Sequence, residues 1–203
     1  MTFDLVHDTQ AAYRTVLDAM SRPGKVVSLA REAEKIDLPD IAGPAARVLM
    51  RMLLDPEVGF CVAGPDHSRI ESRISQLTGS FPVSLPQADF IFVLEQASEK
   101  ECREAMLAAK IGSLTDPHLS ATLVVELPLI GDGGELWIAG PGVAGRSRWP
   151  LTQAASCLNE RNQKIEEFPL GIDLLFVDRS HQLVALPRTS RLFTKSAGSG
   201  VGG

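Results

Sequence analysis

Short apolar runs alternate with segments of helical periodicity along most of this 203-residue chain. The apolar runs at 58–63, 90–94 and 172–177 have the length of buried strands rather than of helices. Between them, apolar residues recur with the period of an α-helix, as at 44–54. Alternation of this kind predicts a sheet with helices on its faces. We therefore expect an α/β fold, a three-layer α/β/α sandwich with a mixed sheet.

The remaining elements are predicted from the same patterns and from their boundary residues. Ser98 and Glu101 form a capping box that begins one helix, and Asp66 is placed to cap another. Residues 131–134 are a Gly-rich turn, which predicts a hairpin between strands at 121–127 and 136–139. Residues 30–42 are expected to be irregular. The other predicted helices are 8–21 and 152–167, and the other strands are 25–29 and 182–186.

Length and composition limit the class of protein. We expect a single domain over 1–195, followed by a flexible Gly/Ser tail at 196–203. A net charge of −5 argues against a general nucleic-acid binder. No run approaches the roughly 18 apolar residues of a membrane span, and the first residues lack the pattern of a secretory signal. The expected location is the cytoplasm.

Familiar catalytic and metal-binding motifs are absent from the sequence. Its histidines and cysteines are scattered, without the short spacings of zinc sites or redox dithiols. Cys61 and Cys102 fit apolar patterns and are expected in the core. No nucleophile elbow and no phosphate-binding loop of recognised spacing occurs. The spacing of residues therefore predicts no metal, no cofactor and no assignable catalytic residue.

Four turns combine Pro or Gly with a polar group that could hold an anion or a partner backbone. They are Met20–Gly24, Thr115–His118, Gly140–Gly142 and Leu186–Thr189. Two interpretations of the arginines stay open. They could bind a phosphate-rich ligand or a neighbouring subunit, or they could simply offset the helix dipole at a helix end and be solvated at the surface. For residues 140–145, a tight turn between strands is favoured over an anion loop. The candidate anion or interface residues are Arg22, Gly24, Asp116, His118, Gly140, Gly142, Asp173, Arg188 and Arg191.

Two of the candidates are acidic. Asp116 precedes Pro117 and is predicted to make an Asx-type turn. Asp173 interrupts an apolar strand, so its carboxylate must be hydrogen-bonded or lie at an edge. A general base at Asp173 has no adjacent carboxylate or histidine to support it.

Five motifs follow one another along the chain: Asp18–Gly24, Asp116–Leu123, Gly140–Gly142, Phe168–Asp173 and Leu186–Arg191. In this order they resemble the PhnH family, the H subunit of the bacterial carbon–phosphorus lyase system. The resemblance runs from about Val6 to Arg191. It departs from the family in Ser21, where alanine is usual, and in Ser190, where threonine is usual.

The resemblance implies a role in phosphonate catabolism. It implies that the chain works with the G, I and L subunits to form α-D-ribose 1-alkylphosphonate 5-triphosphate from ATP and an alkylphosphonate. It also implies a homodimer when the chain is alone, and a core complex with the G, I and J subunits. The implied fold is similar to the large domain of pyridoxal-phosphate-dependent transferases, without the cofactor.

Three functions stay open from the sequence. The favoured one is an accessory subunit of a transferase assembly, in which no residue is assigned a catalytic role. The second is a purely structural subunit that touches no ligand. The third is a stand-alone enzyme on a transferase-like fold. Exposed apolar edge segments of the sheet are expected to form the interface.

Overall fold

The structure is a computed structural model that describes residues 2–36, 41–131, 135–151, 158, 160–162 and 168–194. Its helices are α1 (His7–Ser21), α2 (Ala30–Ala33), α3 (Pro44–Leu53), α4 (His67–Thr78) and α5 (Glu99–Ala108), with 3-10 turns η1 (Leu85–Gln87) and η2 (Pro117–Leu119). Its strands are β1 (Val27–Ser28), β2 (Gly59–Ala63), β3 (Phe81–Pro82), β4 (Phe90–Val93), β5 (Thr122–Leu127), β6 (Leu136–Ala139), β7 (Ser147–Arg148), β8 (Asp173–Asp178), β9 (Gln182–Leu186) and β10 (Arg191–Thr194).

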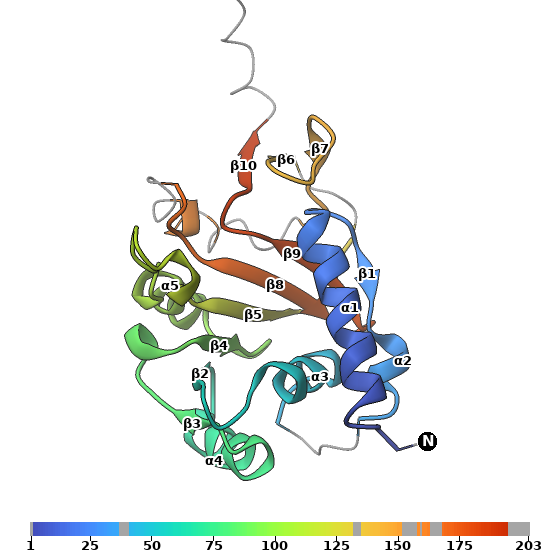
Figure 1. Cartoon of the computed structure of the whole chain (residues 1–203), viewed down its shortest axis with the longest axis vertical. Helices are drawn as coiled ribbons and strands as arrows, with labels where there is room; N and C mark the ends of the chain where they lie inside the picture. Colours follow the sequence, from blue (N-terminus) through green and yellow to red (C-terminus); the bar gives the residue numbers. More distant parts are fainter. Residues whose placement is uncertain are drawn as a thin grey trace, which may run out of the picture.

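The described strands form two sheets (Figure 1). The larger has seven strands in the order β1-β9-β8-β5-β4-β2-β3, and the smaller has the order β10-β6-β7. In the larger sheet β3, β2, β4, β5 and β8 are parallel. Strand β9 is antiparallel to its two neighbours, β8 and β1. The fold is thus a mixed α/β fold with a mixed sheet, as predicted.

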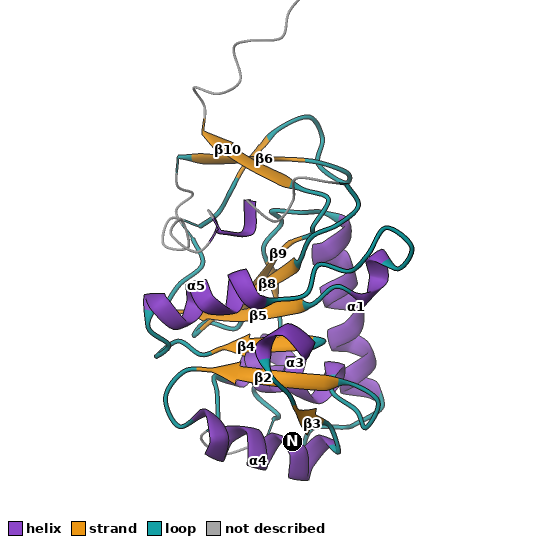
Figure 2. Ribbon diagram, turned by 90° about the vertical axis from the view of Figure 1, so that its left-hand side faces the viewer, coloured by secondary structure: helices purple, strands orange, loops and turns teal. Residues whose placement is uncertain are grey.

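The direction of each crossover decides which face its helix covers. From β2 the chain passes through α4 to β3 on one side, and then from β4 through α5 to β5 on the other. Because parallel crossovers are right-handed, opposite directions put the two helices on opposite faces. Residues of α1, α3 and α4 share one buried cluster, and residues of α5 belong to a second (Figure 2).

Strand β4 shows how the sheet divides the core. Phe92 packs in the cluster with α1, α3 and α4, whereas Ile91 and Val93 pack in the cluster with α5. All three are buried, because successive side chains of a strand point to opposite faces and both faces are covered here. This accounts for the all-apolar runs in the sequence.

The smaller sheet packs beside the larger one. Its strand β6 pairs with β10, with Ile138 opposite Leu192, and also with β7. Trp149, which follows β7, is buried and meets the Phe176 ring of β8 edge-on, with centroids 6.0 Å apart. The predicted hairpin between 121–127 and 136–139 is therefore wrong. Strand β5 already has β4 and β8 as neighbours, so no edge is left for β6.

Most of the other predicted elements are confirmed within a few residues. The capping box at Ser98 and Glu101 is present at the start of α5. Asp66 does not cap α4, however: it adopts a left-handed conformation, with φ of 55°, and its side chain makes no capping bond. Residues 30–42 contain the single turn α2, which is too short to give a periodic signal. Cys102 is buried, as expected, whereas Cys61 is half-buried and packs against the same cluster from outside.

Some predictions fall outside the described residues. Most of the helix predicted at 152–167 does so, although residues 158 and 160–162 are helical. The Gly/Ser tail at 196–203 and Cys157 also lie outside. Within the described part of the chain, no helix is long and apolar enough to cross a membrane.

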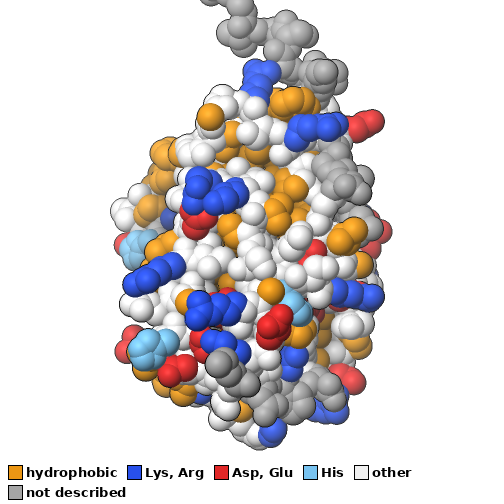
Figure 3. Space-filling view, turned by 90° about the vertical axis from the view of Figure 1, so that its right-hand side faces the viewer, with side chains coloured by type: hydrophobic (Ala, Val, Ile, Leu, Met, Phe, Trp, Pro, Cys, Tyr) orange, Lys and Arg blue, Asp and Glu red, His pale blue; other side chains and the backbone are white. Residues whose placement is uncertain are grey.

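The outer side of α1 leaves apolar residues in contact with solvent. Its buried residues include Ala12, Val16 and Ala19. Tyr13 and Leu17, by contrast, are 52% and 48% exposed. Figure 3 faces the α1–β1 side and shows hydrophobic side chains at the surface between groups of Lys and Arg. These residues lie on a helix rather than on an edge strand of the sheet, so an interface formed by edge segments stays a prediction.

Candidate functional site

Arg188 and Asp173, two of the predicted residues, meet at the amino-terminal edge of the parallel strands. The backbone amide of Arg188 donates to Oδ1 of Asp173 over 2.7 Å. The Arg188 guanidinium donates to the carbonyl oxygen of Pro117 and to Oγ of Ser120. As predicted, the carboxylate inside the strand is hydrogen-bonded. Both side chains hold the backbone in place.

The Asp116 turn lies against this cluster, but not as an Asx-type turn. The Asp116 side chain makes no capping bond, whereas its carbonyl oxygen accepts from the amides of Ser113 and Leu119 at 3.2 Å each. The amide of Asp116 donates to Oγ of Ser113 at 3.0 Å. The prediction of an Asx-type turn is therefore wrong, because Ser113 supplies the side-chain oxygen instead.

A buried arginine that sequence reasoning missed holds the segment around Arg188 from the other side. Arg161 is fully buried and donates to the carbonyl oxygens of Pro187, at 2.6 Å, and Ser190, at 3.2 Å. Burial lowers the pKa of Arg161 to about 10, and the nearby charge of Asp173 opposes that shift. In the sequence Arg161 reads only as a polar residue of a predicted helix, so no signal distinguishes it.

The predicted glycines form a second group, where three of the turns touch one another. A side chain at Gly142 would overlap the carbonyl oxygen of Ser21, and a Cβ at Gly140 would lie 2.9 Å from Cα of Ser190. A Cβ at Gly24 would lie 3.3 Å from Ile138. These close approaches explain the glycines without a ligand. The interpretation of 140–145 as a tight turn between strands is confirmed, because it joins β6 to β7.

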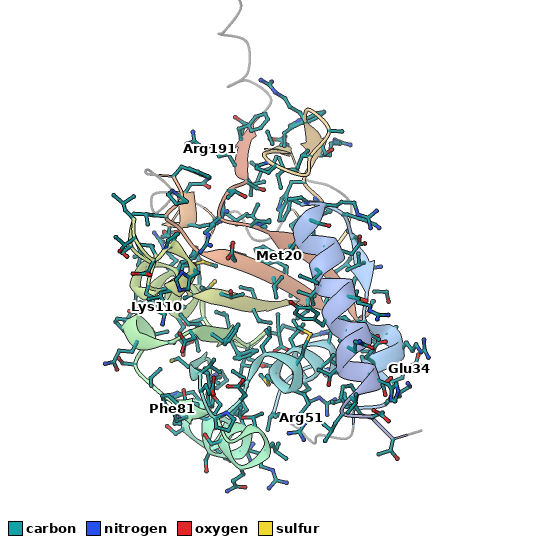
Figure 4. The ribbon with its side chains drawn as sticks, viewed as in Figure 1. Met20, Glu34, Arg51, Phe81, Lys110 and Arg191 are labelled. Atoms are coloured by element: carbon teal, nitrogen blue, oxygen red, sulfur yellow. The ribbon has the colours of Figure 1, made fainter. Side chains whose placement is uncertain are left out.

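The remaining three predicted residues lie at the surface. Arg22 forms an ion pair with Asp18, one turn earlier in α1. His118 is exposed in η2. Arg191 is exposed on β10, at the end of the molecule opposite Phe81 and Arg51 (Figure 4). An anion or interface role for these residues stays a prediction.

A cavity that was not predicted lies at the opposite edge of the sheet. It has a volume of about 590 Å³ and is formed where β4, β5 and β8 end and α3 begins. In open α/β sheets this carboxyl edge is where ligands usually bind. Its polar lining includes Arg69, Glu95, Glu126, Asp178, Arg179 and His181.

Glu126 lies at the centre of the polar lining and joins two elements. Its Oε1 accepts from the amide of Gly43 at 2.6 Å, and its Oε2 accepts from the amide of Glu95 at 3.2 Å. Burial raises the pKa of Glu126 even though both bonds favour the charged form. A Cβ at Gly43 would lie 2.7 Å from Oε1, so glycine allows this approach.

Three other charged residues of the cavity are also bonded within the protein. Arg179 pairs with Glu95, with Nε 2.8 Å from Oε2. Asp178 accepts from the amide of Ile130 at 2.8 Å and from two amides of the following turn. His181, in that turn, has φ of 62° and a buried Nδ1 without a partner. The sequence signal for this site was available: a polar residue at the end of each of three apolar strands.

Metal binding finds no support in this geometry. The described residues contain no group of three or more His, Cys, Asp or Glu side chains that could hold a metal ion.

Comparison with known proteins agrees with the motifs. The family model described as bacterial phosphonate metabolism protein (PhnH) matches residues 2–193. A candidate C–P lyase subunit protein named HtxG, from Stutzerimonas stutzeri, is 29% identical over 189 residues, which cover 93% of this chain and 87% of that protein. Since the match spans almost the whole sequence, the chain belongs to the PhnH family of bacterial phosphonate metabolism proteins.

Proposed function

We propose that this chain is the H-type subunit of a carbon–phosphorus lyase system, needed with G, I and L subunits to form α-D-ribose 1-alkylphosphonate 5-triphosphate from ATP and an alkylphosphonate. The observation that carries the proposal is the family match over residues 2–193. The likeness to a C–P lyase subunit protein over 93% of the chain supports membership of such an assembly.

The geometry favours an accessory role over catalysis by this chain alone. Asp173 and Arg188 bond to each other and to backbone groups. The glycines of the motifs allow turns to touch. A general base or nucleophile needs a partner within hydrogen-bond reach, and these contacts supply none. The stand-alone enzyme is therefore the less favoured alternative.

The fold and the assembly carry further proposals. The seven-stranded mixed sheet is compatible with a likeness to the large domain of pyridoxal-phosphate-dependent transferases, and that likeness stays a prediction. A single domain over 1–195 and a cytoplasmic location also stay predictions. A homodimer of the free chain, and a core complex with G, I and J subunits, would cover exposed apolar residues such as Tyr13 and Leu17.

The native mass of the chain tests the subunit role. We would measure it for the purified chain alone and after co-expression with G- and I-type subunits of the same genome. Incorporation into one stoichiometric complex is expected. A chain that keeps its own mass with all partners present would refute the subunit role and favour a stand-alone activity.

Substitutions at the exposed arginines distinguish a ligand-binding role of the chain from the purely structural alternative. Arg22→Gln and Arg191→Gln should weaken synthesis by the assembled complex if these side chains hold an anionic ligand. Complexes that assemble and work normally with both substitutions would leave a structural role for this end of the molecule.

A further inference from the structure

We propose that the cavity at the carboxyl edge of the sheet binds a small phosphorylated molecule that carries free hydroxyl groups, of the class of sugar phosphates and nucleotides. The cavity is the one lined by Glu126, Glu95 and Arg69. This inference rests on the proposed function, since it gives a substrate of the assembly a place in this chain.

The inner wall of the cavity offers hydrogen-bond acceptors. Each oxygen of Glu126 accepts one backbone amide, from Gly43 or from Glu95. An ionised carboxylate has about four acceptor positions, so about two remain for a ligand. Asp178 also lines the cavity, with its carboxylate bonded to three backbone amides. A ligand that fits these groups must donate hydrogen bonds, as sugar hydroxyls do.

The outer part of the cavity offers cations. Arg69 is exposed in the first turn of α4, and Arg179 is exposed beside Glu95. Arg179 gives Nε and one terminal nitrogen to Glu95, which leaves its other terminal nitrogen for a ligand. Guanidinium groups bind phosphate well because their planar N–H donors match two of its oxygens.

Together the two parts exclude simpler ligands. A bare anion would meet Glu126, Glu95 and Asp178, whose charges repel it, and a bare cation would meet the two guanidinium groups. A molecule with a neutral, hydroxyl-bearing body and an anionic end satisfies both. The apolar part of the lining, with Ile41, Ile70 and Leu94 among it, suits the carbon skeleton of such a body.

The size and position of the cavity agree with this class. Small-molecule sites are typically about 300–1,000 Å³, and this cavity has a volume of about 590 Å³. The crossover from β2 leads toward β3, whereas the crossover from β4 leads in the opposite direction, toward β5. That reversal of strand order marks the point where open α/β sheets hold ligands.

Calorimetric titration of the full chain with four probes tests the proposal. The probes are ribose 5-phosphate, AMP, inorganic phosphate and ribose. Ribose 5-phosphate or AMP should bind at least about tenfold more tightly than phosphate or ribose, each of which satisfies only one part of the cavity. If AMP binds more tightly than ribose 5-phosphate, the ligand is a nucleotide. If AMP and ribose 5-phosphate bind equally, the ligand is a sugar phosphate.

Paired variants on one helix locate the site. Arg69→Gln should weaken binding about tenfold, because it removes a charge-assisted contact. Arg73→Gln is the matched control: Arg73 lies one turn further along α4, is exposed and does not line the cavity. It should bind like the unmodified chain. Hydrogen exchange should show new protection at the amides of Gly43 and Glu95 when the probe is bound.

Three outcomes would overturn the proposal: no binding of any probe at millimolar concentration, equal binding by Arg69→Gln and the unmodified chain, or protection confined to residues 186–191. None of these would touch the subunit role, which co-expression tests without a ligand. A chain that binds the probes but never joins a complex would remove the proposed function instead.

Discussion

The backbone amide of Arg188 donates to the carboxylate of Asp173 over 2.7 Å, across the amino-terminal edge of the large sheet. The same arginine reaches Pro117 and Ser120 with its guanidinium. One residue thus joins the end of β9, the start of β8 and the η2 turn. Residues that mark the family in the sequence are here used to connect segments far apart in the chain.

Replacing Arg188 by methionine should destabilise the fold. The change leaves the Pro117 carbonyl and the Ser120 hydroxyl without their charged donor, and loss of such bonds costs about 1.5–3 kcal/mol. Arg191→Met is the control, since Arg191 is exposed and should stay within about 0.5 kcal/mol. Urea unfolding measures both. Equal stabilities for the two variants would contradict the anchoring role of Arg188.

Gly142→Ala should destabilise more than Gly145→Ala. Both glycines have positive φ, of 80° and 71°, so both variants incur a backbone cost of about 1–2 kcal/mol. Only at Gly142 does the new methyl group overlap another atom, the Ser21 carbonyl oxygen, whereas nothing lies within 4 Å at Gly145. Thermal unfolding of the two variants gives the difference. If they unfold together, the contact between the two turns is not important for stability.

The sequence predicted the large sheet well, because its signals are local. Buried parallel strands such as β4 consist of apolar residues only, and the capping box at Ser98 and Glu101 satisfies its own bonds within one turn. The pairing of β6 with β10 was not predictable in this way. Strand β10 lies more than fifty residues from β6 in the sequence. The residues of one strand do not indicate which distant strand it will pair with.

The motif residues and the cavity residues differ, for a similar reason, in how easily the sequence reveals their role. Motifs rich in Pro, Gly and Arg stand out in a sequence, but here the glycines allow close backbone contacts and Arg188 bonds to carbonyl and hydroxyl groups. The cavity is assembled from single polar residues at the ends of separate strands. Glu126 is one acid among many in the sequence, and its bond to the amide of Gly43, just before α3, is seen only in the folded chain.

Glu126→Gln should gain stability relative to the unmodified chain as pH rises. Burial raises the pKa of Glu126 above its ordinary value of 4.5 in the folded state. The folded state therefore holds this proton more strongly than the unfolded state does, so ionisation lowers the stability of the unmodified chain as pH increases from about 4.5 through the raised pKa. Glutamine does not titrate and escapes this loss. Urea unfolding of both proteins from pH 4 to 8 measures the difference.

Glu101→Gln supplies a control of opposite sign. Bonds from Ser98 lower the pKa of Glu101 in the folded state, so its ionisation adds stability as pH rises toward 4.5. The Glu101→Gln variant should lose stability relative to the unmodified chain over that lower range. The same pH trend in both variants would mean that burial of Glu126 has no specific effect.

Cys61 should react slowly with alkylating reagents while the chain is folded. Burial, and next the charge of Glu71, raise the pKa of the Cys61 thiol to about 11 from its ordinary 9.0. At pH 8 the folded chain then has about one hundredth of the thiolate of the unfolded chain, and only the thiolate reacts. Mass spectrometry of the Cys61 peptide after iodoacetamide treatment, with and without urea, gives the ratio of rates. Glu71→Gln should speed the folded reaction, because it removes the negative charge; folded and unfolded rates that are equal at pH 8 would show that the thiol is not shielded.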